Sequence, residues 1–151
     1  MSTHPRYYKR LTMQMKYILT ASLAAILIIG CKSTSSGDIP KGAFAYTSFD
    51  SSGVELASGW LTIITSDPSA LSGEWHMKAV EGAERIGPQR GDGNLIGGLS
   101  NDRAWVELNP KVRNNNLQLN GTLDRSQFTG QWTWISYNGI ANQGTFKAIR
   151  K

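Results

Sequence analysis

Residues able to carry covalent chemistry are few in this chain. Its one cysteine, Cys31, comes directly after an apolar run that ends Leu27-Ile28-Ile29-Gly30, and His76 is the one histidine beyond that point. A lone histidine supplies neither a Ser-His-Asp relay nor a histidine-rich metal site. A single thiol behind a small residue is instead a candidate for covalent modification. The sequence therefore indicates one modification chemistry, at Cys31, and no catalytic centre built on histidine.

The carboxylates form no catalytic or metal-binding pattern. Glycoside hydrolysis needs two of them facing one cleft, but here they fall in expected turns or on the outer face of expected strands. Nine of the eleven are Glu55, Asp67, Glu74, Glu81, Glu84, Asp92, Asp102, Glu107 and Asp124. The segment Gly91-Asp92-Gly93-Asn94 lacks the further oxygen ligands and the closing glutamate of a calcium loop. We therefore expect no enzyme activity, no cofactor and no bound metal, and we interpret His76 as a solvated strand residue.

The first 31 residues resemble the precursor of a bacterial lipoprotein. Four basic residues and no acidic one precede an uncharged stretch, 17–30, which is shorter than the roughly 20 residues that span a bilayer as a helix. The resemblance assigns Ile28-Ile29-Gly30-Cys31 as the lipobox. It implies cleavage before Cys31, a diacylglyceryl group on the Cys31 thiol and, usually, an acylated amino terminus. An ordinary buried thiol behind a plain signal peptide or an anchor helix is the alternative.

Two further expectations follow from the same resemblance. The residue after the lipidated cysteine is Lys32, not the aspartate that favours the inner membrane, so we expect an outer-membrane protein if the host has an outer membrane. The stretch before the apolar run is long for such a leader, so translation could start at Met1, Met13 or Met15. We expect three parts: a signal peptide (1–30), the lipidated cysteine with a Ser-, Thr- and Gly-rich flexible tether (31–41), and one folded domain (42–151).

Net charge argues against a nucleic-acid partner. The whole chain carries +5, but four of its sixteen basic residues and none of its eleven acidic residues precede Cys31, which leaves +1 for the rest. The remaining basic residues form no run, so the electrostatic signature of nucleic-acid binding is missing. We expect a monomer attached to the membrane by its lipid.

Alternating apolar and polar residues, with turn residues between them, predict an all-β fold without helices. The eight expected strands are 43–49, 54–65, 70–80, 93–100, 103–109, 116–124, 127–137 and 143–150. Turn residues, among them Asp50-Ser51-Ser52-Gly53, Asp124-Arg125-Ser126 and Tyr137-Asn138-Gly139, separate most of them. Residues 81–90 are expected to be a loop.

A short internal repeat supports this assignment. Residues 69–75 (SALSGEW) and 126–132 (SQFTGQW) match as S-x-(L/F)-(S/T)-G-x-W, fifty-seven residues apart. Each copy is followed by a loop and a strand that begins Gly-x-Leu or Gly-x-Phe. Two similar three-strand units are therefore expected, one formed by the strands at 54–65, 70–80 and 93–100 and the other by those at 116–124, 127–137 and 143–150. Their similarity indicates either duplication or convergent requirements of the hairpins.

One face of the expected sheet is apolar, and an antiparallel eight-stranded up-and-down barrel would hide it while removing the open edges. A two-sheet sandwich would also hide this face and is the alternative. The outline resembles barrels of the avidin and lipocalin type, whose G-x-W and G-x-Y motifs are similar to Gly73-x-Trp75 and Gly130-x-Trp132. The polar set that contacts the ligand of an avidin is not found, so biotin binding is not implied. The C-terminal stretch is also similar to small bacterial barrel domains of unassigned function.

Two binding hypotheses follow. In the first, an aromatic interior holds a small apolar ligand such as an acyl chain; the alternative is a solid core without a pocket. The interior cavity of this first hypothesis would be lined by Trp60, Trp75, Met77, Phe128, Trp132, Trp134 and Phe146. In the second, Trp105 stands outside beside Arg103 and Glu107 and anchors an envelope protein, as in an inhibitor or assembly factor; the alternative is that Trp105 lies against a neighbouring strand.

Overall fold

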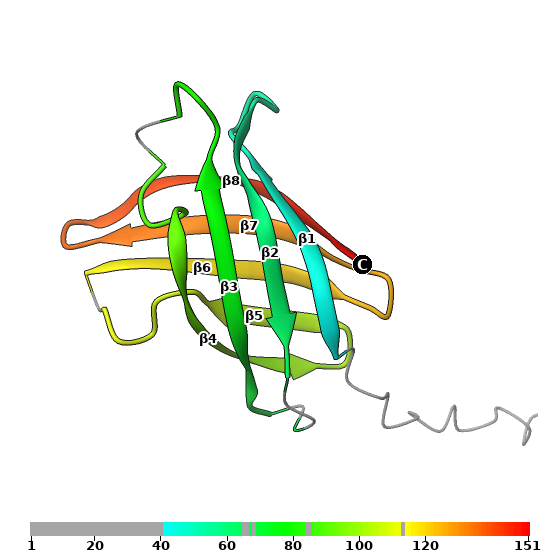
Figure 1. The fold of residues 1–151 in the computed structure, drawn as a ribbon. Coiled ribbons are helices and arrows are strands. Elements are labelled where there is room, and N and C mark those ends of the chain that lie inside the picture. The colour runs from blue at the N-terminus through cyan, green and yellow to red at the C-terminus, as the bar shows by residue number, and fades with distance from the viewer. Residues whose placement is uncertain (1–40, 65–66, 68, 84–85, 113) are drawn as a thin grey trace, which may run out of the picture. The chain divides into compact units, whose positions relative to one another are not determined.

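The computed structural model describes residues 41–64, 67, 69–83, 86–112 and 114–151. These form a closed antiparallel barrel in which each strand pairs with the next and the last pairs with the first (Figure 1). Its strands are β1 (Gly42–Phe49), β2 (Glu55–Ile63), β3 (Leu71–Ala79), β4 (Gly91–Ser100), β5 (Arg103–Glu107), β6 (Asn115–Leu123), β7 (Gln127–Ser136) and β8 (Gly139–Arg150). The expected all-β up-and-down barrel is confirmed. The signal peptide, Cys31 and most of the tether lie outside the described residues.

Closure depends on pairing between the two ends of the described chain. β1 pairs with β8 from Phe44 opposite Arg150 to Phe49 opposite Thr145. This pairing gives both edge strands a partner, so their backbone donors and acceptors are satisfied inside the sheet. None of the described residues belongs to a helix long and apolar enough to cross a membrane.

The largest difference from the expected strands is at β8. The sequence predicts that this strand begins at residue 143, but it begins at Gly139, directly after a two-residue turn at Tyr137 and Asn138. Ser136 pairs with Gly139, and Gly139 has a φ of +101°, which non-glycine residues rarely adopt. The turn is therefore tight, and the β7–β8 hairpin is longer than predicted.

The core contains aromatic and aliphatic side chains from all eight strands, and none of the buried side chains in the described chain is charged. The loop expected at 81–90 also contributes to it. Ile86, Pro88 and Gln89 of this loop are buried. The Gln89 side-chain oxygen accepts a hydrogen bond from the Tyr46 hydroxyl at 3.1 Å. Burial raises the pKa of Tyr46, so its hydroxyl stays protonated and able to donate.

The repeated G-x-W motif corresponds to a repeated structural unit. Trp75 on β3 lies against Gly93 on β4, and its indole N–H donates to the backbone oxygen of Leu108, just after β5. Trp132 on β7 lies against Gly144 on β8, and its indole N–H donates to the backbone oxygen of Phe49 at the end of β1, at 2.9 Å. Each tryptophan thus connects three successive strands. The two units lie four strands apart around the barrel.

Three turns share one capping arrangement. The carboxylates of Asp50, Asp67 and Asp124 each accept a 2.7 Å hydrogen bond from the hydroxyl of the serine two residues later, and each also accepts from the backbone N–H of that serine. The serine hydroxyl, followed by backbone N–H groups, holds the pKa of each carboxyl below its usual value. These Asp-x-Ser segments act as turns, as expected from their sequence.

Candidate functional site on the outer wall of the barrel

The residues proposed to line an interior cavity do not all lie inside. Five of them are buried together in the core: Trp75, Met77, Phe128, Trp132 and Phe146. Phe146 packs edge-on against Phe128, with ring centroids 4.7 Å apart, and is stacked with Tyr46 at 5.8 Å. These contacts are those of a packed core. A ligand role for the five remains a prediction.

Trp60 was expected in the interior, and that expectation is wrong. It pairs with His76 in the β2–β3 register, and the two half-buried rings stack with centroids 6.0 Å apart. The inward positions of β2 are its neighbours Ala57, Leu61 and Ile63, which are buried. Strand alternation therefore directs Trp60 to the outer face. His76, predicted to be a solvated strand residue, lies on that face as well.

Trp134 lies at the margin of the core. It is half-buried and packs against the core cluster, and its indole N–H donates to the side-chain oxygen of Asn115 at 2.9 Å. A Cβ atom at Gly87 would lie 2.4 Å from the indole, so the loop after β3 can approach Trp134 only with glycine there. Trp134 is thus positioned by the loop and by β6.

Trp105 stands on the outer wall, as its alternation with Ala104 and Val106 predicts. Its side chain is 46 % exposed, whereas its two neighbours are buried. The indole also lies over Gly98 of β4, where a Cβ atom would be 2.7 Å from the indole nitrogen. Trp105 therefore rests on a neighbouring strand and still presents much of its ring to solvent, and its role as a partner-binding residue stays a prediction.

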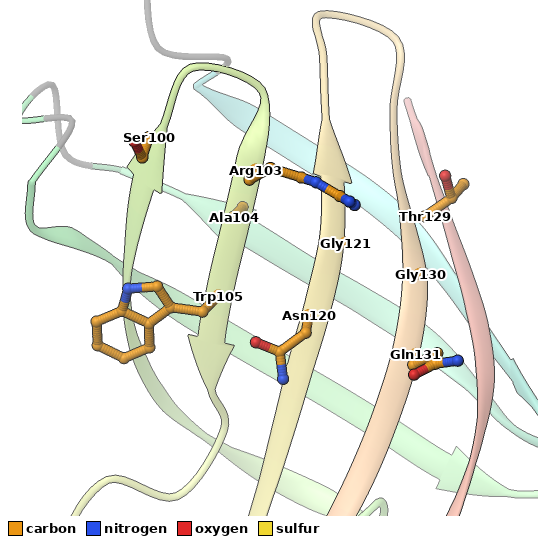
Figure 2. Close-up of a pocket in the computed structure, with 9 residues that line it drawn as sticks. All are labelled: Ser100, Arg103, Ala104, Trp105, Asn120, Gly121, Thr129, Gly130 and Gln131. Carbon is orange, nitrogen blue, oxygen red and sulfur yellow. The ribbon is translucent and has the colours of Figure 1, made fainter.

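Trp105 borders a groove of about 680 Å³ across β5, β6 and β7 (Figure 2). Two outward-facing rows of paired residues form its sides. One row contains Trp105, Asn120 and Gln131, which are consecutive partners in the register. The lining residues of the other row are Ser100, Arg103 and Thr129. The groove thus combines an exposed aromatic ring with side chains that donate and accept hydrogen bonds.

Small residues form the floor of this groove. The row between its two sides is Ala104, Gly121 and Gly130, which are also consecutive partners. A Cβ atom at Gly130 would lie 2.1 Å from the Asn120 backbone oxygen and 2.5 Å from the Gly121 Cα atom. β6 and β7 can therefore approach this closely only because both positions are glycine.

Arg103 is the one charged residue among those that line the groove, and no carboxylate is among them. Glu107, which was grouped with Arg103 and Trp105 as a partner-binding residue, is not part of the lining. It is half-buried, and its carboxylate accepts a hydrogen bond from the Gln118 side chain at 3.1 Å. Elsewhere in the described residues, no three His, Cys, Asp or Glu side chains gather closely enough to hold a metal ion.

Sequence reasoning missed Asn120, Thr129 and Gln131 as groove residues, because polar residues on an outer face carry no signal of their own. It also missed a second exposed aromatic feature at the tip of the β7–β8 hairpin. There Tyr137 is 83 % exposed, and Ile140 is exposed beside it. Tyr137 does not line the groove, so it offers a matched control for Trp105.

The fold and this surface define the class of the protein: a closed eight-stranded up-and-down β-barrel with an aromatic core and a mixed aromatic and polar groove on its outer wall. Compared with protein families, with curated proteins and with solved structures, the chain shows no match.

Proposed function

We propose that this protein is a non-catalytic, membrane-anchored binding module of the bacterial cell envelope, and that it captures an envelope component in the groove around Trp105. The single observation behind this proposal is the position of Trp105: half-exposed at the side of a groove of about 680 Å³. The volume falls within the range of roughly 300–1,000 Å³ usual for ligand sites. Exposed tryptophans that border a recess are frequent energetic anchors of binding.

The proposed anchor supports a binding role more than a catalytic one. Lipid on Cys31 and a tether over 32–41 would hold the barrel within a short distance of the membrane surface. Such a restriction raises the effective concentration of the barrel toward other envelope components. Lys32 favours the outer membrane for this attachment.

The proposed site can be tested in cells by photo-cross-linking. Benzoylphenylalanine introduced in place of Gln131 should yield a reproducible adduct, because position 131 lines the groove in the same row as Trp105, two strands away. Combining it with Trp105→Ala should reduce the adduct about tenfold, since a central tryptophan anchor commonly contributes 2 kcal/mol or more. Tyr137→Ala removes an exposed aromatic outside the groove and should leave the adduct unchanged. An adduct that survives Trp105→Ala would contradict the proposal.

A second candidate function, an apolar ligand inside the barrel, is favoured by one observation. The Ser48 hydroxyl is fully buried on the inner side of β1, where its hydrogen-bonding neighbour is the Tyr46 hydroxyl, which already donates to Gln89. This leaves hydrogen-bonding capacity at the Ser48 hydroxyl that the polar end of a bound molecule would use. The apolar part of such a molecule would then contact the interior aromatic residues.

Native mass spectrometry separates this candidate from a filled core. The protein released intact from membranes should carry an additional mass of a few hundred daltons beyond its own acyl groups, and this mass should disappear on denaturation. Ser48→Ala should reduce the occupied fraction. Equal native and denatured masses would remove the interior candidate and leave the groove as the binding site.

A further inference from the structure

We propose that the occupant of the groove is an oligosaccharide that carries an acidic group. This inference rests on the proposed function, which leaves the class of ligand open. It follows from three properties of the lining: the exposed indole, the two neighbouring amides, and the single positive charge.

The indole offers the kind of surface that a sugar ring contacts. Trp105 lies over the backbone of β4 at Gly98, and Figure 2 shows its ring extended from β5 toward β4, on the side away from Asn120, with no other aromatic side chain among the lining residues. The C–H groups on one side of a pyranose ring pack against an indole of this kind, while its hydroxyl groups stay at the periphery. A tryptophan held by a glycine contact also loses little further freedom on binding.

The amides of Asn120 and Gln131 suit hydroxyl groups. Each amide both donates and accepts hydrogen bonds, as a sugar hydroxyl does. Both belong to the same row as Trp105, on the next two strands. With neighbouring strands about 4.8 Å apart, this row extends about 10 Å from the tryptophan, which is comparable with two linked sugar rings. The groove therefore fits an oligosaccharide better than a single sugar.

Arg103 adds a preference for an acidic group. It lines the groove from the neighbouring row, and no carboxylate is among the lining residues to compete for its guanidinium. Guanidinium groups bind carboxylate or phosphate with two parallel hydrogen bonds. Figure 2 shows the Arg103 side chain extended toward β6, over the glycine floor. An acidic sugar stacked beside Trp105 would place its charged group within this part of the groove.

The same lining disfavours a protein partner. The cores of protein interfaces are enriched in aromatic residues and methionine and are more apolar than the rest of the surface. Around Trp105, however, the lining consists of amide, hydroxyl, guanidinium, alanine and glycine groups. One positive charge is also too little for a nucleic acid, which is held by many phosphate contacts. A polar, weakly charged, flat-sided ligand remains the best chemical fit.

Titration calorimetry on the full-length protein in detergent tests this inference. The acidic probes are oligogalacturonate and soluble peptidoglycan glycan strands, and the neutral probes are maltotetraose and chitotetraose. At least one acidic probe should bind about tenfold more tightly than the neutral ones, because a charge-assisted bidentate contact is formed. Trp105→Ala should weaken its binding by about tenfold or more. Arg103→Gln should remove the acidic preference, and Tyr137→Ala should change nothing.

The outcomes separate this inference from the proposed function. If no probe binds, or if Trp105→Ala binds the acidic probe as well as the unchanged protein, the oligosaccharide assignment is wrong. If neutral and acidic probes bind equally and Arg103→Gln has no effect, the acidic preference is wrong. A Gln131 photo-adduct that contains a protein and depends on Trp105 would overturn the oligosaccharide and retain the groove. Loss of both the adduct and the binding would overturn both proposals.

Discussion

Replacing Cys31 by serine should abolish lipidation completely. The proposed reaction forms a thioether on the Cys31 sulfur, and a serine hydroxyl is a far weaker nucleophile than a thiolate. No second cysteine exists in the chain to substitute for it. Cells grown with labelled palmitate should therefore label the unchanged protein and leave the Cys31→Ser variant unlabelled. The variant should also migrate as a longer precursor, because the resemblance implies cleavage directly before a lipidated cysteine.

The consequence for membrane attachment is equally direct. The apolar stretch 17–30 is short for a spanning helix, so stable attachment would depend on the acyl chains. Two or more chains are needed for lasting anchorage, and a diacylglyceryl group supplies two. Ser33→Ala alters the same tether without touching the thiol and should label and fractionate normally. Palmitate incorporation that persists in Cys31→Ser would show that Cys31 is not the modified residue.

The largest effect on stability is expected from Trp132→Ala. The indole is completely buried, lies against Gly144 and donates to the Phe49 backbone oxygen, so it connects β7, β8 and β1. Truncating a buried tryptophan commonly costs about 3–5 kcal/mol. That is a large part of the roughly 5–15 kcal/mol that stabilises a typical domain. Urea unfolding followed by circular dichroism should show a much lower midpoint for Trp132→Ala, or a protein that is already unfolded.

Two companion variants identify the reason for this loss. Trp132→Phe keeps most of the apolar contact but removes the indole N–H, and should cost about 1–3 kcal/mol because the Phe49 carbonyl loses its side-chain donor. Trp75→Ala removes the equivalent tryptophan of the other unit and should destabilise by a similar amount. Tyr137→Ala, on the exposed hairpin tip, should be close to neutral. If Trp132→Ala unfolds at the same urea concentration as Tyr137→Ala, the role assigned to this contact is wrong.

Local chemistry was sufficient to predict the architecture. Two-residue alternation identified the strands, and Asp-x-Ser segments identified turns that the hydrogen bonds of Asp50 and Asp124 confirm. The repeated G-x-W motif anticipated two similar units, but the tryptophan contacts join β3, β4 and β5 and then β7, β8 and β1, one strand later than the expected sets. An apolar inner face with no buried charge then favoured a closed sheet over a two-sheet sandwich, and the pairing of β1 with β8 decided between them. Each of these signals depends on residues close together in the chain.

Only the tertiary structure decided which face some residues occupy and which residues meet. Trp60 was assigned to the interior by its apolar character, but the pairing of β2 with β3 places it beside His76 on the outside. The groove joins Trp105 to Asn120 and Gln131, and that row exists only because three strands pair in one register. The sequence by itself determined the eight antiparallel strands, their apolar inner face and the outward position of Trp105. The groove depends on strand register, which is fixed by pairing between residues far apart in the sequence. A shift of one residue in that register would move every side chain of a strand to the opposite face of the sheet.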